Sequence, residues 1–411
     1  MSRLLYRRQW QGSETWVWYS LLLAGGCLLA CAALGSYALL LIAPAFGAVA
    51  IFHSVGSQQV HRCAFVLQMA WQTLWHLRLH CREHDLQGPP GIRLTIALSS
   101  LMLQTQRVTS LALDIHEGKV TIVSERRDGR ELLPWALPLC SYLLFFPALL
   151  GGPLCSFRRF QARVQRSCAS GPAPPLRAAG QKCLRALALH LLRMAVRGSA
   201  APLAYLTDCT GFGCMWALWH SALLFRLAYY AQWALDEALL SVAGFGLEPG
   251  HEHAEETACA DLSDADLWTL ETTHRLAHFT RTWNKSTSRW LRRLIFQRSP
   301  VQPLWATFAF SAWWHGLHPG QVFGFFCWAA MVEADYRIHP FLRSLAKSWQ
   351  ATVLYKALAW VQTQLLVAYI TAAVEMRSFA VLWLLGASYN SFFPLLYGAA
   401  LLWLVVRSKV K

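Results

Sequence analysis

Long apolar segments separated by short polar connectors dominate the pattern of this chain. They span residues 16–35, 37–54, 62–80, 92–114, 134–152, 181–206, 212–245, 303–332, 351–375 and 378–406. About 20 consecutive apolar residues are enough for a helix to cross the hydrocarbon core of a bilayer. The pattern therefore predicts an all-α polytopic integral membrane protein with about nine to eleven transmembrane helices.

Three of these segments depart from a simple span. Segment 62–80 contains Arg62 and Arg78, so it either crosses the membrane or lies along its interface. Segment 92–114 carries Arg107 inside the apolar run, which indicates a helix that faces the interior of the bundle. Segment 212–245 is long enough for one span and a short returning piece.

The composition excludes a soluble domain, because 55% of the 411 residues are apolar and only 37 are Lys or Arg and 22 Asp or Glu. The formal net charge of +15 is distributed unevenly. Residues 132–207 hold nine Lys or Arg and no acid, and residues 272–331 hold seven and no acid. By the positive-inside rule, both basic zones face the cytosol. The charge thus indicates sidedness in a membrane, and we expect lipids but no nucleic acid as partners.

The polar connectors do not divide the chain into separate domains, and we interpret residues 1–411 as one membrane-embedded domain. Residues 116–133 form a charged connector, residues 166–178 a Pro/Ala/Ser linker and residues 246–266 an acidic loop. The 12 Cys include no CxxC pair, and several lie in apolar runs. We interpret them as small core residues and not as a disulfide or zinc framework. The first apolar run has no clear cleavage site, so we expect it to be retained.

His315 is the most informative residue of the chain. It lies in the stretch from Pro303 to Val332, which contains no Asp, Glu, Lys or Arg. An ionisable side chain inside an apolar span is a functional-site hypothesis by default. Gly316 and Pro319 follow, so the helix is expected to break beside the imidazole. Broken helices at membrane depth occur where they line a cavity. The alternative is a structural histidine that bonds a backbone carbonyl at the break.

Asn284 precedes His315 by 31 residues, in the segment FTRTWNKSTSRWLRRLIFQ. Tryptophan and arginine side chains alternate there, which predicts an amphipathic basic helix at the cytosolic interface. Twelve residues separate Pro303 from His315, which corresponds to about 18 Å of a core about 30 Å thick. His315 is therefore expected past the midplane, toward the far side of the membrane. Asn284-Lys285-Ser286 is also a glycosylation sequon, but sequons act in the lumen and the basic neighbours favour the cytosolic side.

Several strings of this sequence match a known family. The Trp-Asn pair in a basic segment, together with the histidine of SAWWHG, resembles the membrane-bound O-acyltransferases. The stretch SYLLFFPALLGGPLCSFRRFQ (141–161) looks like another signature of that family. The strings QQVHR (58–62), SSLMLQTQRVTSLALD (99–114) and ADLWTLETTHR (265–275) are similar to one branch that acylates a secreted peptide. Residues 1–20 diverge from this pattern, and residues 165–210 match only loosely.

The resemblance implies a membrane-bound O-acyltransferase fold around a central tunnel, with re-entrant pieces and a catalytic region at residues 279–332. It implies transfer of a medium-chain acyl group, octanoyl above all, from acyl-CoA to a serine hydroxyl of a peptide hormone. Acyl-CoA is then a co-substrate, and we expect no permanently bound cofactor and no metal. The expected location is the endoplasmic reticulum membrane, and the basic C-terminal string RSKVK loosely resembles a retrieval signal.

The residues fit this chemistry. A serine hydroxyl is a poor nucleophile until a base removes its proton, and the pKa of histidine suits that task near pH 7. We therefore expect His315 to be the general base and Asn284 to bind the thioester carbonyl. Coenzyme A is a polyanion, so nearby arginines are candidate phosphate contacts; they are Arg289, Arg292 and Arg293.

Other polar residues have structural interpretations that we favour. For His318 a turn-capping role before Pro319 is expected, and Glu333 and Asp335 are expected to mark the membrane interface. Arg107 is expected to be packed in the interior.

Two weaker motifs compete with this site. The string HCREHD, from His80 to Asp85, has the H-x4-D pattern of glycerolipid acyltransferases, but a single short pattern is weak. Histidines and acids of the acidic loop could bind a metal, although a solvated loop is the better default; these are His251, His253, Glu255 and Glu256.

Three functional alternatives remain at this point. A related membrane O-acyltransferase would act on a lipid or on another secreted protein. A transporter would use His315 as a proton relay, but it would need more acids inside the spans. A catalytically dead scaffold would not need the Asn284 and His315 pair.

Overall fold

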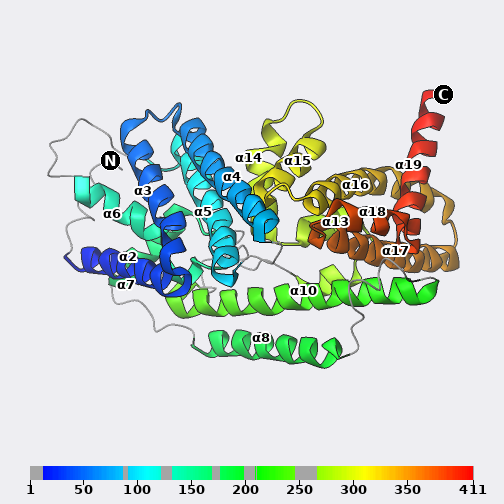
Figure 1. Cartoon of the computed structure of the whole chain (residues 1–411), viewed down its shortest axis with the longest axis horizontal. Helices are drawn as coiled ribbons and strands as arrows, with labels where there is room; N and C mark the ends of the chain where they lie inside the picture. The colour runs from blue at the N-terminus through cyan, green and yellow to red at the C-terminus, as the bar shows by residue number, and fades with distance from the viewer. Residues whose placement is uncertain are drawn as a thin grey trace. The chain divides into compact units, whose positions relative to one another are not determined.

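The computed structural model describes residues 13–86, 91–121, 132–168, 176–198, 209, 211–245 and 266–410, and every regular element in these ranges is a helix (Figure 1). The all-α prediction is thus confirmed for the described chain. Two compact units are present. Unit 1 comprises residues 1–182 and 236–262, and unit 2 comprises residues 183–235 and 263–411.

Unit 1 is built mainly from the first half of the chain. Its helices are α2 (Ser13–Leu34), α3 (Leu39–Ser54), α4 (Val60–Leu86), α5 (Ile92–His116), α6 (Leu132–Leu143) and α7 (Phe157–Cys168), with the short elements η1 (Gly35–Ala38), η3 (Phe146–Ala148) and η4 (Ser241–Phe245). The first two apolar segments are therefore two helices joined at η1, as the sequence pattern predicts.

Arg107 of α5 lies inside unit 1 and not at its surface. The side chain is 5% exposed, and its guanidinium donates to the backbone carbonyls of Leu143 and Ala148. These carbonyls belong to the end of α6 and to η3, where the chain leaves regular helix and frees its acceptors. The prediction of a packed interior arginine is confirmed.

Unit 2 contains the rest of the helices. They are α12 (Leu267–Thr272), α13 (Leu276–Thr282), α14 (Lys285–Leu294), η6 (Phe296–Arg298), α15 (Pro303–His315), α16 (Pro319–Leu345), α17 (Trp349–Glu375), α18 (Phe379–Ala387), η7 (Tyr389–Ser391) and α19 (Phe392–Val410). Two further helices, α8 (Leu176–Arg197) and α10 (Phe212–Leu240), continue across the boundary between the units.

Two expectations about segment continuity are wrong. Segment 212–245 is not a span with a returning piece, because α10 continues as one helix of 29 residues and only its last turn is irregular. Segment 378–406 is not continuous, because the chain breaks at η7 between α18 and α19. Hydropathy identifies where apolar residues are concentrated. Whether a helix breaks within such a segment depends instead on local capping and packing.

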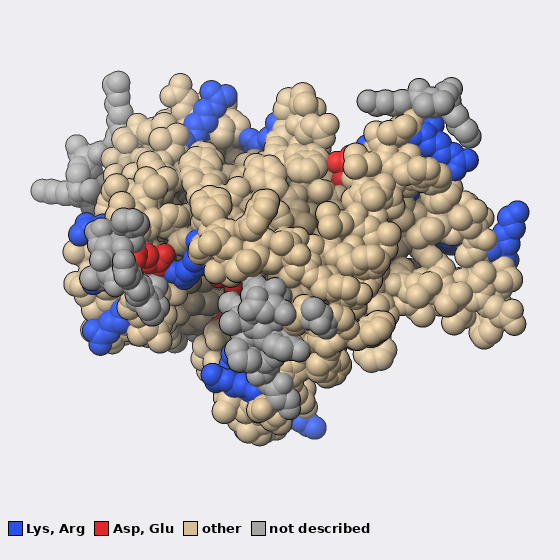
Figure 2. Space-filling model, turned by 45° about the vertical axis from the view of Figure 1, so that its right-hand side comes forward, with Lys and Arg blue, Asp and Glu red and all other residues tan. Residues whose placement is uncertain are grey.

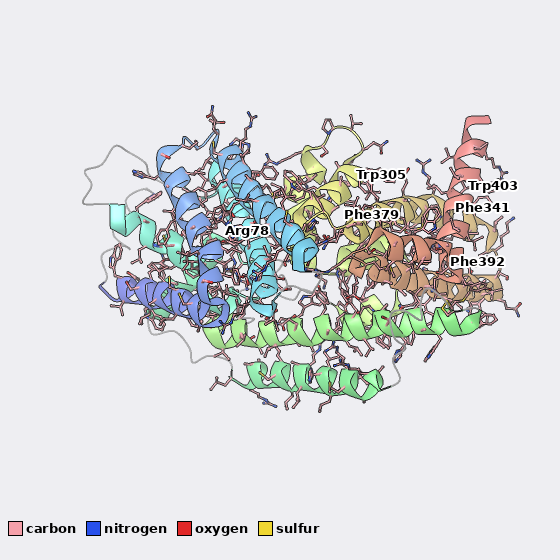
Figure 3. The ribbon with its side chains drawn as sticks, viewed as in Figure 1. Arg78, Trp305, Phe341, Phe379, Phe392 and Trp403 are labelled. Atoms are coloured by element: carbon pink, nitrogen blue, oxygen red, sulfur yellow. A yellow bond between two sulfur atoms is a disulfide. The ribbon has the colours of Figure 1, made fainter. Side chains whose placement is uncertain are left out.

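The C-terminal helix of unit 2 packs on α16 through aromatic contacts. The rings of Phe341 and Trp403, both labelled in Figure 3, have centroids 5.6 Å apart. The guanidinium of Arg407 lies over both rings, at 6.0 Å from the first and 5.2 Å from the second. Such cation–π contacts hold a basic residue at the end of an apolar helix.

Three segments of the described chain are long and apolar enough to cross a membrane by themselves: Thr15–Ser54, Trp349–Glu375 and Tyr389–Arg407. Trp135–Ala148 is a shorter apolar helix. Figure 2 shows broad areas of surface that carry no charged side chain, as lipid contact requires. The total of nine to eleven spans stays a prediction.

One pair of cysteines contradicts the interpretation as core residues. Cys209 and Cys214 form a disulfide at the start of α10, with their Cα atoms 5.2 Å apart. A separation of five residues is not a CxxC pattern, which is why the sequence did not reveal it. Cys140 is free and buried in unit 1, in agreement with the expectation.

Candidate active site

The break after His315 is encoded by the residues that follow it. Pro303 begins α15, and the helix ends at His315 because Gly316 adopts a φ of 119°, which is favourable only for glycine. His318 then stands at the N-cap of α16, with Pro319 in the first helical turn. The Oε1 atom of Gln321 accepts a hydrogen bond of 3.3 Å from the His318 backbone N–H. The expected break and the expected capping role of His318 are both confirmed.

Gly320 allows the start of α16 to approach α17 closely. Its backbone N–H donates to the carbonyl oxygen of Met376 over 3.1 Å. A Cβ at this position would lie only 2.1 Å from that oxygen and 2.2 Å from the carbonyl oxygen of Ala373. Glycine is therefore required where the loop after His315 turns into the bundle.

The imidazole of His315 lies between aromatic rings. Its centroid is 4.8 Å from that of Trp314 and 4.8 Å from that of Phe325 on α16. Phe325 in turn stacks on Trp328, with an interplanar angle of 8°. His315 is half-buried. The aromatic contacts restrict the orientation of the ring and leave part of it accessible.

Asn284 occupies the sharp turn between α13 and α14. Its backbone is left-handed, with a φ of 47°, a conformation that asparagine tolerates better than most residues. Its side-chain oxygen caps α14 by accepting from the backbone N–H of Thr287 at 3.1 Å, and the hydroxyl of Ser286 lies 3.4 Å away. Because the oxygen is the acceptor in the cap, the amide NH2 group is the part of the side chain that can donate to a substrate.

Aromatic contacts join α14 to the end of α15. Trp290 of α14 is 3% exposed, and its ring lies 5.0 Å from that of Trp314 and 5.8 Å from that of Phe310. Trp314 immediately precedes His315. The ring of Trp290 thus packs α14 against the helix that ends at His315.

The three candidate phosphate contacts all lie on α14. Arg289 and Arg292 are exposed and Arg293 is half-buried. Arg292 lies on the side of the helix away from Trp290, whereas Arg293, three residues after Trp290, lies on the same side as that ring. The exposed side chains of Arg289 and Arg292 are therefore the ones that an anionic ligand outside the helix can reach.

Comparison with known proteins identifies the family. Residues 91–372, which include both Asn284 and His315, match the model of the membrane-bound O-acyltransferase family. Membrane-bound ghrelin O-acyltransferase of Mus musculus is 53% identical over 393 residues, which cover 95% of this chain and 90% of the relative. The protein of the same name from Rattus norvegicus is 52% identical over 397 residues, or 96% and 90%. This chain belongs to the membrane-bound O-acyltransferase family.

Other members of the family are less similar. Membrane-bound glycerophospholipid O-acyltransferase 1 of Mus musculus is 29% identical over 351 residues, which cover 77% of this chain and 69% of the relative. The family assignment makes the chain a multi-pass membrane enzyme that transfers acyl groups, so the transporter and scaffold alternatives are set aside.

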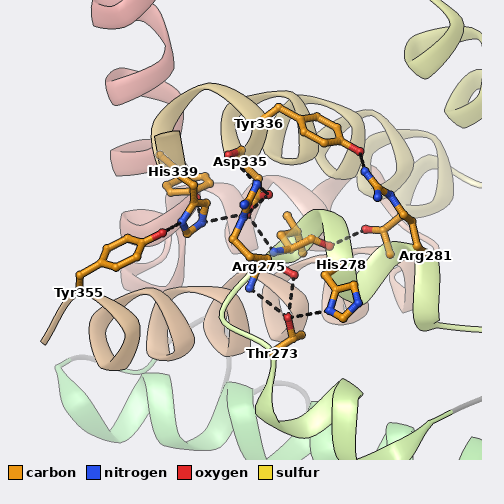
Figure 4. A network of polar contacts seen from close by, with 11 residues as sticks. Thr273, Arg275, His278, Arg281, Asp335, Tyr336, His339 and Tyr355 are labelled. Atoms are coloured by element: carbon orange, nitrogen blue, oxygen red, sulfur yellow. Dashed lines mark hydrogen bonds and ion pairs between the residues drawn. The ribbon is translucent and has the colours of Figure 1, made fainter. Parts of the chain in front are cut away.

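This O-acyltransferase also contains a polar network that the sequence did not indicate (Figure 4). Asp335 is fully buried on α16 and accepts bonds from four donors. These are Nε and Nη2 of Arg275, the backbone N–H of Leu276 and Nε2 of His339, at 2.9–3.0 Å. The other ring nitrogen of His339 contacts the hydroxyl of Tyr355 on α17.

Asp335 is therefore held inside the bundle, and its expected depth at the membrane interface stays a prediction. The acid lies at the end of an apolar run, but its charge is compensated by Arg275, which is remote in sequence. By contrast, Glu333 is 28% exposed, accepts from Trp305 Nε1 at 2.8 Å and pairs with Arg337. In the sequence, Arg275 and Asp335 are only an isolated base and an isolated acid. No motif or periodicity indicates that the two residues form a pair.

A second buried charge pair fixes α12 against α10 and α17. Arg226 is 1% exposed, and its Nη2 atom lies 3.2 Å from Glu271 and 3.1 Å from Oε1 of Gln364. The Tyr230 hydroxyl donates to Glu271 over 2.8 Å, and Trp360 donates to the Glu271 carbonyl. Glu271 and Arg275 both come before α13 in the sequence. The two networks together therefore hold the start of the segment that leads to Asn284.

The competing motifs gain no support. His80 lies near the end of α4, but the side chain of Asp85 is outside the described residues. His251, His253, Glu255 and Glu256 are also outside them. In the described ranges no group of three His, Cys, Asp or Glu could hold a metal ion.

Proposed function

We propose that this enzyme transfers a medium-chain acyl group, octanoyl above all, from acyl-CoA to a serine hydroxyl of the peptide hormone ghrelin or its precursor. The observation that carries the proposal is the difference in identity between two kinds of relative. The ghrelin O-acyltransferases are 52–53% identical over 95–96% of the chain, whereas the first glycerophospholipid acyltransferase is 29% identical over 77%.

His315 acts as the general base in this proposal. Its imidazole takes the proton of the serine hydroxyl while the oxygen attacks the thioester carbonyl carbon. The tetrahedral intermediate then expels the CoA thiolate, which receives the proton from the imidazolium. The C–O bond of the new ester thus forms in the first step, and the C–S bond of the thioester breaks in the second. The half-buried ring held by Trp314 and Phe325 supports this assignment, because a positioned base needs both restriction and access.

Asn284 binds the thioester oxygen. The side-chain oxygen of Asn284 is occupied by the cap of α14. The NH2 group is therefore the part of the side chain that donates a hydrogen bond to a ligand. A donor that bonds the oxyanion more strongly than the ground-state carbonyl contributes about 10²–10³ in rate. The contact between Trp290, six residues after Asn284, and Trp314, which precedes His315, supports the action of Asn284 and His315 on one thioester.

The CoA moiety approaches from the cytosolic side. Arg289, Arg292 and Arg293 bind its phosphates, since the first two are exposed on α14, the third is half-buried beside them, and no acid lies between residues 272 and 331. Guanidinium groups form charge-assisted, bidentate bonds to phosphate. The protein is a multi-pass enzyme of the endoplasmic reticulum membrane in this proposal, and membrane lipids surround it.

The peptide approaches from the lumen. Disulfides persist in oxidising compartments, so Cys209–Cys214 supports a luminal position for the start of α10. Ala217 and Leu218 of that helix form one apolar cluster with Met376. Met376 accepts from Gly320, five residues after His315. These contacts support a luminal position for the His315 end of α15, in agreement with its expected depth.

An acceptor competition tests the function. Membranes that contain the enzyme would receive labelled octanoyl-CoA together with the N-terminal peptide of proghrelin or with a lysophospholipid. Acylation of the serine peptide, and not of a peptide with alanine at that serine, is expected. Acylation of the lysophospholipid alone would replace the proposal with a lipid acceptor.

A further inference from the structure

A row of polar side chains runs through the interior of unit 1, where α4 and α5 pack together. We call this row the polar seam, and it consists of Gln68, Gln72 and His76 on α4 and Ser100, Gln104 and Thr105 on α5. Each side chain is at most 6% exposed. On α4 the three residues are spaced by four, so they share one face of the helix. Its other faces carry exposed apolar residues such as Leu74 and Leu77.

Two amide donors of the seam, together with the neighbouring Trp71, bond backbone carbonyls of α3. Pro44 lies inside that helix and has no N–H, which leaves the carbonyl of Leu40 without its usual donor. Trp71 Nε1 donates to the Leu40 oxygen at 3.1 Å. Gln104 Nε2 donates to the Leu41 oxygen at 2.8 Å, and Gln68 Nε2 donates to the Pro44 oxygen at 3.3 Å. Side chains of α4 and α5 thus repair the proline break.

Several acceptor groups of the seam have no such partner. The Oε1 atoms of Gln68 and Gln104, the Oγ atom of Ser100 and the Nδ1 atom of His76 are buried and have no hydrogen-bond partner among the described residues. Within the seam, Gln72 is hydrogen-bonded to Thr105 at 2.7 Å and to His76 at 3.4 Å. A buried polar atom without a partner is strongly unfavourable, and lipid cannot supply one.

We propose that the polar seam binds a row of water molecules inside unit 1. Water fits because every unpartnered atom can accept and water donates two hydrogen bonds. An anion would meet the oxygens of Gln68 and Gln104, and a cation would find no carboxylate among the seam residues. An acyl chain would leave the acceptors unpaired. Gln68, Gln72 and His76 follow one another at intervals of four residues on α4, and Ser100 and Gln104 do the same on α5. Residues with this interval lie about 6 Å apart along a helix, which is a suitable spacing for bridging waters.

The seam residues all belong to unit 1, whereas Asn284 and His315 belong to unit 2. The seam packs against the apolar segment Thr15–Ser54, through the bonds to Leu40, Leu41 and Pro44. The water molecules would complete the support of α3 around Pro44 and give unit 1 a wet interior.

Two buried positions of α5 provide a matched test. Ser100 is 1% exposed and belongs to the seam, whereas Ala97 is 0% exposed and belongs to the apolar core of unit 1. Ser100→Cys and Ala97→Cys would be treated in membranes with methanethiosulfonate ethylammonium, and each site followed by peptide mass spectrometry. Because only hydrated thiolates react, we expect Ser100→Cys to react at least about tenfold faster. Equal rates, or a faster reaction at Ala97→Cys, would overturn the proposal.

A second measurement uses the unsubstituted protein, so its result does not depend on whether the variants fold. Hydroxyl radicals generated from water by radiolysis label side chains that adjoin bound water. His76 is 6% exposed and Phe160, in the apolar core of the same unit, is 1% exposed. Labelling of His76 without labelling of Phe160 is expected. Protection of both rings would show that the seam is dry.

Discussion

Arg275 and Asp335 are 60 residues apart in sequence and form a buried ion pair in which Nε and Nη2 of the arginine lie 3.0 and 2.9 Å from one carboxylate oxygen. The other carboxylate oxygen accepts from the first backbone N–H of α13, at Leu276. The pair therefore fixes the start of α13 on α16. Seven residues later α13 ends and Asn284 follows, so the pair also sets the position of the candidate active site.

Asp335→Asn is expected to destabilise the protein strongly. The neutral amide cannot compensate Arg275, and it replaces one acceptor oxygen by a donor. Removing one partner of a buried pair costs about 3–5 kcal/mol, and the lower end applies because Arg275 is 32% exposed. Thermal unfolding in detergent measures the loss. Glu333→Gln, two residues earlier on α16, is the control and is expected to cost less, since Glu333 is 28% exposed. Equal effects of the two substitutions would contradict the special role of Asp335.

Asn284→Asp separates capping from chemistry. An aspartate oxygen still accepts from the Thr287 N–H, so the cap and the stability are expected to persist. The NH2 donor is lost, and a negative charge faces the developing oxyanion. The acylation rate is therefore expected to fall about 10²-fold or more. Asn284→Ala should lose both the rate and about 1 kcal/mol of stability. An aspartate variant with full activity would show that the amide donor is not needed.

Replacing the arginines of α14 by glutamine is expected to weaken binding of acyl-CoA. Arg289→Gln, Arg292→Gln and Arg293→Gln each remove one charge from the proposed phosphate contacts. The KM for octanoyl-CoA should rise, with less change in kcat, and the salt dependence of the KM should become weaker. Arg197→Gln, at the exposed end of α8, is the control. The assignment fails if the KM of the α14 variants equals that of the control.

Gly320→Ala is expected to disrupt the loop that follows His315. The added methyl group would clash with backbone oxygens at 2.1 and 2.2 Å, and backbone cannot move away as a side chain can. Overpacking of this kind costs about 1–3 kcal/mol or more. Gly386→Ala in α18 meets no atom within 4 Å and should be neutral or slightly stabilising. Unfolding temperatures of the two variants decide the matter, and a stable Gly320→Ala protein would contradict the close contact.

Local signals in the sequence predicted much of this structure. Apolar runs located the helices, and Gly316 with Pro319 predicted the break beside His315 because both residues act on the backbone where they stand. The burial of Asp335 was not predictable in this way, since it depends on an arginine 60 residues away. The Cys209–Cys214 bond was missed because its spacing matches no common motif. The left-handed backbone of Asn284 was also hidden, since the sequence shows the residue but not its φ.

The central claim is that His315 is the base that activates the acceptor serine. The most direct test measures octanoyl transfer to the proghrelin N-terminal peptide by membranes with wild-type enzyme or His315→Ala, at equal expression. His53→Gln, an exposed histidine on α3, is the matched control. Loss of general-base catalysis is expected to lower the rate about 10²–10⁴-fold in His315→Ala and not in the control. Equal rates in His315→Ala and wild type would contradict the account.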